Sequence, residues 1–258
     1  MHLYWLEQTQ AEVPEGDAWL SGAEVSLQER LRFAKRRNDW RLGRWTAKVA
    51  VASYLHSPFL YSNLALIEVR AEPSGAPQAF IVDNRFAETI SLSHCNGRAI
   101  CLVASSQAAM GCDLEAIEAR GPAFFDDYFT SSEQSWIGAA PEAHHPKLTT
   151  LVWSAKESAL KALRVGLRSP TRSVIVSPIH LSPASEAEIS ADTRQENPDR
   201  WYPLRVDSQG GCVFSGWWRY WKEFVYTVVS DASADPPIRL EVARPADLAA
   251  LTTIRDAG

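Results

Sequence analysis

Residues 149–164 read Thr-Thr-Leu-Val-Trp-Ser-Ala-Lys-Glu-Ser-Ala-Leu-Lys-Ala-Leu-Arg and form the most regular helical pattern of the chain. Wound at 100° per residue, the helix predicted over 149–163 gathers its apolar residues on one arc: Leu151, Val152, Ala155, Ala159, Ala162 and Leu163. The opposite arc carries Trp153, Ser154, Glu157, Lys161 and Arg164. Such an arc could be a solvated face with one Glu157–Lys161 ion pair. An indole is unusual on a solvated face, which leaves a functional face as the alternative.

A strand that carries two acids precedes this helix. Residues 111–115 read Gly-Cys-Asp-Leu-Glu, within a strand predicted over 111–117. Residues two apart on a strand point the same way, so Asp113 and Glu115 project together. Two adjacent carboxylates repel each other unless water or a hard cation separates them. The pair is therefore either a solvated strand face or a site for Mg²⁺ completed by substrate phosphates.

A hairpin is predicted just before that strand, because Asn96-Gly97 lies between apolar runs at 89–93 and 99–104. Ser93 and His94 end the first run. A hydroxyl, an imidazole and the free N–H groups of a glycine turn can bind phosphate. An ordinary hairpin histidine is the alternative.

A helical region is predicted over 26–54, with a possible break at Asn38-Asp39. Arg37, Arg41, Arg44 and Lys48 follow each other at steps of four, three and four residues. Four like charges on one helical stripe cost stability unless an anion neutralises them. In an acidic chain we expect that anion to be a phosphate-rich small molecule.

The composition excludes several classes of function. The 258 residues carry a formal charge of −5, which argues against a general nucleic-acid binder. No apolar run approaches the ~20 residues of a membrane span, and the N-terminus lacks the pattern of a signal peptide. The four cysteines form no CxxC pair and the histidines no HExxH spacing, so reduced thiols in a cytoplasmic protein are expected.

The order of elements predicts two α/β halves, at 1–108 and 109–235, with a peripheral tail at 236–258. The second half is expected to contain a helix over 124–137 and strands over 174–176, 201–206, 213–220 and 224–229. A variable surface loop is expected over 178–200, where Ser, Ala, Glu and Pro are frequent. No residue-level repeat between the halves is evident from the sequence.

The acidic strand and the helix together resemble a known paired signature. Gly111–Glu115 fits G-(hydrophobic)-D-(hydrophobic)-E, and Trp153–Lys161 fits W-x-x-K-E-(small)-x-x-K some forty residues on. This pair, preceded by Ser93-His94, resembles the 4′-phosphopantetheinyl transferase superfamily. The order and the length are similar to its surfactin-type (Sfp-type) branch. Where many members have G-K-P, this chain reads Gly75-Ala76-Pro77, so one lysine contact to coenzyme A is missing.

The resemblance implies an α+β fold of two similar halves related by a pseudo-twofold, with the active site in the cleft between them. It implies transfer of 4′-phosphopantetheine from coenzyme A to a serine of an apo acyl or peptidyl carrier protein. Glu157 and Lys161 would be catalytic, and Asp113, Glu115 and Glu157 would hold Mg²⁺ or Mn²⁺. The resemblance implies that Arg44, Ser93 and His94 bind coenzyme A. Further residues implied to bind it are Arg37, Lys48, Asp113, Lys156 and Lys161. The protein would act as a monomer, without nucleic acid or membrane.

Three points stay open at this stage. Glu133 lies in Thr130-Ser131-Ser132-Glu133, which fits a capping box and also a position where family members often carry an acid. The aromatic residues between 121 and 137 either form a docking surface for the carrier or fill the core. The rival functions are another Mg²⁺-dependent nucleotide-diphosphate enzyme and a non-catalytic module that binds coenzyme A or a carrier protein.

Overall fold

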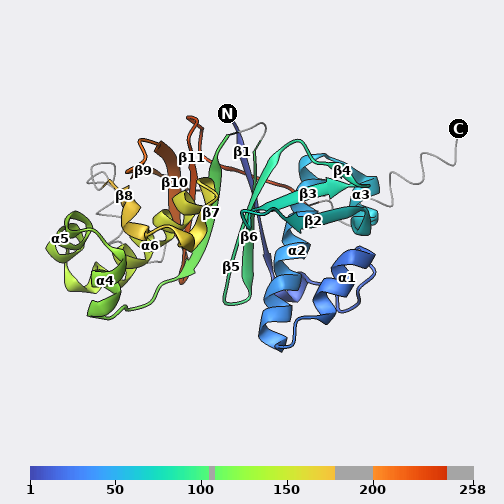
Figure 1. Ribbon diagram of the computed structural model, residues 1–258, viewed down its shortest axis with the longest axis horizontal. Coiled ribbons are helices and arrows are strands. Elements are labelled where there is room, and N and C mark those ends of the chain that lie inside the picture. The colour runs from blue at the N-terminus through green and yellow to red at the C-terminus, as the bar shows by residue number, and fades with distance from the viewer. Residues whose placement is uncertain (105–107, 178–199, 243–258) are drawn as a thin grey trace, which may run out of the picture.

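A computed structural model describes residues 1–104, 108–177 and 200–242 and shows a mixed α+β fold (Figure 1). Two groups of helices and sheets lie side by side and meet along strands β5, β6 and β7 (Figure 1). The α+β class predicted from the sequence is confirmed. No helix in these ranges is both long and apolar enough to cross a bilayer. The predicted loop at 178–200 lies outside the described residues except for Arg200.

The first group, called the first half below, contains residues 1–104, and the second group, called the second half, contains residues 108–177 and 200–230. The helices of the first half are α1 (Gly22–Glu29), α2 (Ala34–Tyr54) and α3 (Pro58–Ser62), with 3₁₀ turns at Gln10–Glu12 and Leu64–Leu66. Its strands are β1 (Leu3–Thr9), β2 (Ile67–Ala71), β3 (Pro77–Ile81), β4 (Asn84–Arg85), β5 (Thr89–Cys95) and β6 (Arg98–Ala104). With β12 (Ile238–Arg239) from the end of the chain, they form one sheet in the order β12-β1-β6-β5 and a second in the order β2-β3-β4.

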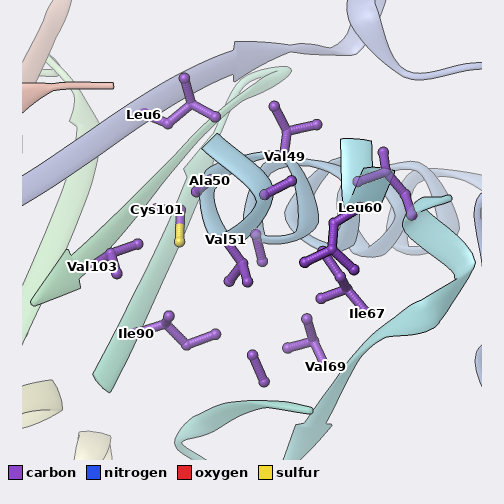
Figure 2. Close-up of a cluster of buried hydrophobic side chains, with 14 of the residues drawn as sticks. Leu6, Val49, Ala50, Val51, Leu60, Ile67, Val69, Ile90, Cys101 and Val103 are labelled. Atoms are coloured by element: carbon purple, nitrogen blue, oxygen red, sulfur yellow. The ribbon is translucent and has the colours of Figure 1, made fainter. Parts of the chain in front are cut away.

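The core of this group forms around helix α2. Val49, Ala50 and Val51 are fully buried on α2 and lie among side chains from the strands around it (Figure 2). The break predicted at Asn38-Asp39 is wrong, since α2 runs through these residues. The chain instead breaks between α1 and α2, where the Arg37 guanidinium donates to the Leu31 carbonyl at 2.9 Å.

The second group contains helices α4 (Pro122–Tyr128), α5 (Ser131–Ala139) and α6 (His145–Ala162), with 3₁₀ turns at Glu142–His144, Gly166–Arg168 and Thr171–Ser173. Its strands are β7 (Met110–Ala116), β8 (Val174–Val176), β9 (Tyr202–Ser208), β10 (Val213–Trp221) and β11 (Phe224–Ser230). The sheet order is β7-β11-β10-β9-β8, and α6 packs on β7 and β11. The single helix predicted over 124–137 is wrong, because Thr130 caps a new helix there.

Gly111 fixes how closely α6 approaches β7. A Cβ atom at this position would lie 2.0 Å from the backbone oxygen of Ser158 on α6. Only glycine fits such a contact between a strand and a helix backbone. The glycine of the acidic strand therefore sets the separation of the two elements that carry the carboxylates.

One buried cluster joins the two groups. It combines Trp5 and Leu102 of the first group with Cys112 and Tyr226 of the second. The tail expected to be peripheral also begins by packing on the first group. Strand β12 (Ile238–Arg239) pairs in parallel with β1, and the amide of Leu240 donates to the Trp5 carbonyl at 2.8 Å.

Candidate active site at the junction of the two halves

Strand β7 and helix α6 bring Asp113 and Lys161 together. Lys161 Nζ lies 2.8 Å from Asp113 Oδ1 and donates to the Cys112 carbonyl at 3.0 Å. Ser93 Oγ, on β5 of the other half, donates to the same carboxylate oxygen at 2.7 Å. The pair is therefore anchored from both halves.

Two carboxylate oxygens at this centre are buried without a hydrogen-bond partner, namely Asp113 Oδ2 and Glu157 Oε1. Burial raises the pKa of Glu157, and the negative charge of Asp113 raises it further. The same two causes raise the pKa of Glu115 to about 7. Because each shift reflects unfavourable negative charge, a cation at this centre would stabilise the ionised carboxylates.

The donor chemistry fits a hard divalent cation, which prefers carboxylate oxygens and retains water or substrate oxygens. Within residues 1–104, 108–177 and 200–242, however, no three His, Cys, Asp or Glu side chains already form a metal-holding cluster. Lys161 engages Asp113 Oδ1, while Glu115 is bonded to Trp153 Nε1 at 3.1 Å. The carboxylate oxygens that could bind a cation are therefore partly engaged by donors of the protein itself.

Lys156 does not reach this centre, although the sequence placed it among the coenzyme A ligands. Its side chain is fully buried, with Nζ 2.8 Å from Glu133 Oε2. The ammonium also donates to the carbonyls of Thr171 and Val174 at 3.1 and 2.7 Å. These contacts use all three N–H donors of a lysine, so none is left for a phosphate.

Glu133 has a structural role in the same network. It completes the capping box of α5 with Thr130, and its Oε1 accepts from the Val176 amide at 2.9 Å. The capping box predicted from the sequence is confirmed. Glu133 is 1% exposed and both of its carboxylate oxygens accept hydrogen bonds, so it is not placed to act as a base on a substrate.

Lys48 is buried in the same way in the first half. Its Nζ lies 2.5 Å from Glu24 Oε2 and donates to the carbonyls of Trp19 and Leu64. Glu24 completes a capping box with Ser21, as Glu133 does with Thr130. Lys48 therefore stabilises the fold, and the sequence prediction that it binds coenzyme A is not supported by its position.

The two buried lysines occupy the same short motif. Residues 45–48 read Trp-Thr-Ala-Lys and residues 153–156 read Trp-Ser-Ala-Lys. Each motif lies on the long helix of its half, α2 or α6. This repeat was missed in the sequence, because three identical residues and one Thr/Ser difference carry little signal until the ion pairs of the two lysines are known.

The predicted arginine stripe does not face a single site. Arg37 donates to the Leu31 carbonyl, and Arg41 forms an ion pair with Asp17. Arg44 lies over the Trp40 ring, 5.0 Å from its centroid, with Nε 3.9 Å from Glu24 Oε1. Burial lowers the pKa of Arg44, which Glu24 partly offsets. Arg41 and Lys48 thus have close carboxylate partners, whereas Arg44 Nε is buried without a hydrogen-bond partner in the described part of the chain.

Two other cations, Lys35 and Arg36, line a cavity together with His94. The cavity has a volume of about 430 Å³ and is lined by Phe33, Lys35, Arg36, Asp39, Trp40 and His94. Lys35 and Arg36 begin helix α2 and are exposed. Removal of the imidazole from water lowers the pKa of His94, partly opposed by Asp39. Both cations belong to the basic start of this helix, but neither was predicted as a site residue, because the helical stripe of like charges begins at Arg37.

A second cavity, of about 510 Å³, lies between the halves and reaches Lys161. One wall is the segment 74–77 with Ala76, and another is β5. Arg164 and Arg168 of the second half line the cavity too. Arg164 pairs with Glu72 at 2.6 Å, and Arg168 donates to the Ser74 carbonyl at 2.6 Å. Of the Asp113–Lys161 pair, Lys161 lines this cavity.

Comparison with known proteins identifies the second half. No curated protein matches the chain. The family model described as the 4′-phosphopantetheinyl transferase superfamily matches residues 109–213. That range contains β7 with Asp113 and Glu115 and α6 with Glu157 and Lys161. The chain therefore carries a 4′-phosphopantetheinyl transferase superfamily domain, and the Asp113–Lys161 centre lies inside it.

Proposed function

We propose that this protein transfers 4′-phosphopantetheine from coenzyme A to a serine of an apo carrier protein and releases adenosine 3′,5′-bisphosphate. The observation that carries the proposal is the Asp113–Lys161 pair inside the matched domain. Asp113 Oδ2 and Glu157 Oε1 are the unpartnered carboxylate oxygens at this pair. Lys161 of this pair lines the cavity between the halves, whose volume of about 510 Å³ lies in the range of small-molecule sites.

In the proposed reaction, the serine Oγ of the carrier attacks the phosphorus that bears the pantetheine. The new O–P bond forms as the bond from that phosphorus to the bridging pyrophosphate oxygen breaks. Glu157 accepts the serine proton, directly or through water. Its Oε1 atom has no hydrogen-bond partner among the residues that the structure describes and is available for this proton.

Lys161 would neutralise charge on the departing phosphate. Burial alone would lower the pKa of Lys161, but the charge of Asp113 raises it above its ordinary value. The ammonium therefore stays charged, which is what a pyrophosphate leaving group requires.

Asp113, Glu115 and Glu157 would hold Mg²⁺, or Mn²⁺ in its place. When bound, the ion would supply positive charge to the pyrophosphate oxygens and to these carboxylates. The unpartnered oxygens of Asp113 and Glu157 support this assignment.

The 3′-phosphate of coenzyme A would bind in the cavity at His94. Lys35 and Arg36 line that cavity and can supply the positive charge. Ser93 Oγ already donates to Asp113, so its role is to orient the carboxylate. We assign the 3′-phosphate to Lys35, Arg36 and His94 in place of Arg44, Arg37 and Lys48.

The arrangement also supports the surfactin-type branch with its two related halves. The Lys48–Glu24 and Lys156–Glu133 pairs repeat the same contacts in the two halves. Strands β1 and β7 occupy matching places, each antiparallel to the last hairpin strand of its half, β6 or β11. We propose a pseudo-twofold relation between residues 1–108 and 109–235 on these grounds.

Helix α4 offers the surface that we assign to the carrier protein. Tyr128 is exposed, while Phe124 and Phe125 are half-buried. Phe129 is fully buried and belongs to the core. Phe129 therefore fills the core, and we assign the docking of the carrier to the outer rings, Tyr128 above all.

Mass spectrometry of an apo carrier protein incubated with coenzyme A and Mg²⁺ tests the proposal. We expect the carrier to gain the mass of one phosphopantetheine group, and Asp113→Asn to abolish the gain. Release of adenosine 3′,5′-bisphosphate without carrier modification would instead indicate a nucleotide-diphosphate hydrolase. Binding of coenzyme A with no reaction, tested across acyl and peptidyl carriers, would indicate a non-catalytic module.

A further inference from the structure

The carboxylate of Glu115 is held by two groups from the second half. Trp153 Nε1 on α6 donates to Oε1 at 3.1 Å. Arg120 follows β7 and lies with its guanidinium nitrogen 3.9 Å from Oε2. Glu115 shares its strand face with Asp113, and two neighbouring carboxylates repel each other. Without a donor at Oε1, that repulsion would favour rotation of Glu115 away from Asp113.

Helix α4 supports both groups through Phe124. The Trp153 ring lies 5.1 Å from the Phe124 ring, and the Arg120 guanidinium lies 5.0 Å from the same ring. Tyr128 also packs on the indole, with 5.1 Å between ring centroids, and lies next to Phe124 at 4.9 Å. Two rings thus hold the indole in the orientation that directs its N–H at Glu115. Trp153 is thus partly buried and packed, which disfavours the solvated face that was one of the two alternatives for this arc.

The first half contains the same hydrogen bond with a neutral acceptor. Trp45, at the first position of the Trp-Thr-Ala-Lys motif, donates from Nε1 to Gln8 Oε1 on β1 at 2.9 Å. In each half, the indole reaches from the long helix to the strand beside it. Only the second half places a carboxylate there, next to Asp113.

We propose that Trp153 is a positioning residue that orients Glu115 as a metal ligand, an inference that rests on the proposed metal-dependent transfer. Outer hydrogen-bond donors commonly orient ligating carboxylates, and their loss costs about 10- to 100-fold in metal affinity. The indole supplies one such donor, and the packing of α4 fixes its direction.

The test measures Mn²⁺ binding to the complex of the protein with coenzyme A, without carrier, from the electron paramagnetic resonance signal of free Mn²⁺. We expect Trp153→Phe to weaken binding about tenfold. Trp45→Phe, which removes the matching bond in the first half, should leave the Mn²⁺ affinity unchanged. In turnover, Trp153→Phe should raise KM for Mg²⁺ while kcat at saturating Mg²⁺ stays within about twofold.

A double-mutant cycle separates positioning from general packing. If Trp153 acts through Glu115, Trp153→Phe has no further effect on Mn²⁺ affinity in a Glu115→Gln background. Equal losses in both backgrounds, or an unchanged affinity in Trp153→Phe, would overturn the proposal. If Trp153→Phe does not fold, Phe124→Leu in the same cycle replaces it, because it loosens the indole and keeps its N–H.

The outcomes also distinguish a failure of the role proposed for Trp153 from a failure of the proposed metal site. Loss of Mn²⁺ binding in Asp113→Asn, with an unaffected Trp153→Phe, overturns only the role of Trp153. Mn²⁺ binding that is undetectable in the wild-type complex, or insensitive to Asp113→Asn, overturns the proposed metal site, and the role of Trp153 with it.

Discussion

Lys156 Nζ lies 2.8 Å from Glu133 Oε2, and both side chains are sealed from solvent. Five residues along the same helix, Lys161 pairs with Asp113 at the same distance but is partly exposed at the junction cavity. Helix α6 therefore carries two lysines of different function. One holds α5 and β8 in place, and the other faces the proposed substrate.

Lys156→Met should destabilise the protein strongly. The substitution leaves the Glu133 carboxylate buried without its cation, and breaking a buried pair in this way costs about 3–5 kcal/mol. Urea unfolding measures the loss, and Lys156→Met/Glu133→Gln should recover part of it because the orphaned charge is gone. Wild-type stability combined with a higher KM for coenzyme A would instead return Lys156 to the substrate site.

Arg36→Gln should weaken coenzyme A more than dephospho-coenzyme A. We assign Arg36 to the 3′-phosphate, and a hydrogen bond to a charged group contributes about 1.5–3 kcal/mol, or roughly 10- to 100-fold in Kd. Isothermal titration calorimetry with both ligands gives the difference. Arg37→Gln is the matched control, since the Arg37 guanidinium donates to the Leu31 carbonyl. Equal losses for both ligands in Arg36→Gln would contradict the assignment.

Binding of coenzyme A should take up a proton at His94. In the free protein the pKa of His94 is lowered, chiefly by removal from water, so the imidazole is neutral above its ordinary pKa of about 6.5. A bound phosphate favours the imidazolium and raises that pKa. Affinity should therefore increase as the pH falls from about 8 to about 6.

Calorimetry in buffers of different ionisation enthalpy measures the protons taken up. His94→Asn should remove the pH-dependent difference between coenzyme A and dephospho-coenzyme A. If the pH-dependent difference in affinity persists unchanged in His94→Asn, the proton is taken up by the 3′-phosphate of the ligand. That result would contradict the assignment of the proton to His94.

Tyr128→Ala should raise KM for the carrier protein and leave KM for coenzyme A nearly unchanged. The side chain is exposed on α4, beside the Trp153 ring that faces Glu115. Steady-state kinetics with varied carrier gives both constants. Phe59→Ala removes an exposed aromatic ring on α3 of the other half and serves as the control. A lower Tm with no selective change in carrier KM would assign Tyr128 to packing.

The elements around the site could be predicted from periodicity. The helix expected over 149–163 is α6 (His145–Ala162), and the strand over 111–117 is β7 (Met110–Ala116). The Asn96-Gly97 turn joins β5 to β6 as expected, with positive φ at both residues. These patterns are local, so the sequence alone carries them.

The roles of single charges could not be predicted in this way. Periodicity indicates the face on which Lys48 or Lys156 lies, but their partners, Glu24 and Glu133, are more than twenty residues away. Both partners follow a capping residue by three positions, which is the one local signal available. Lys35 and Arg36 join His94 only through the packing of α2 against β5.

The rate of holo-carrier formation by Glu157→Gln, followed by mass spectrometry with coenzyme A and Mg²⁺, tests the central claim most directly. Glutamine keeps the size of the side chain but can neither accept the serine proton nor supply a negative metal ligand. We predict wild-type Tm with a rate at least about 100-fold below the wild type, and no wild-type transfer in excess EDTA. A near-wild-type rate for Glu157→Gln, or full wild-type activity in EDTA, would contradict the account.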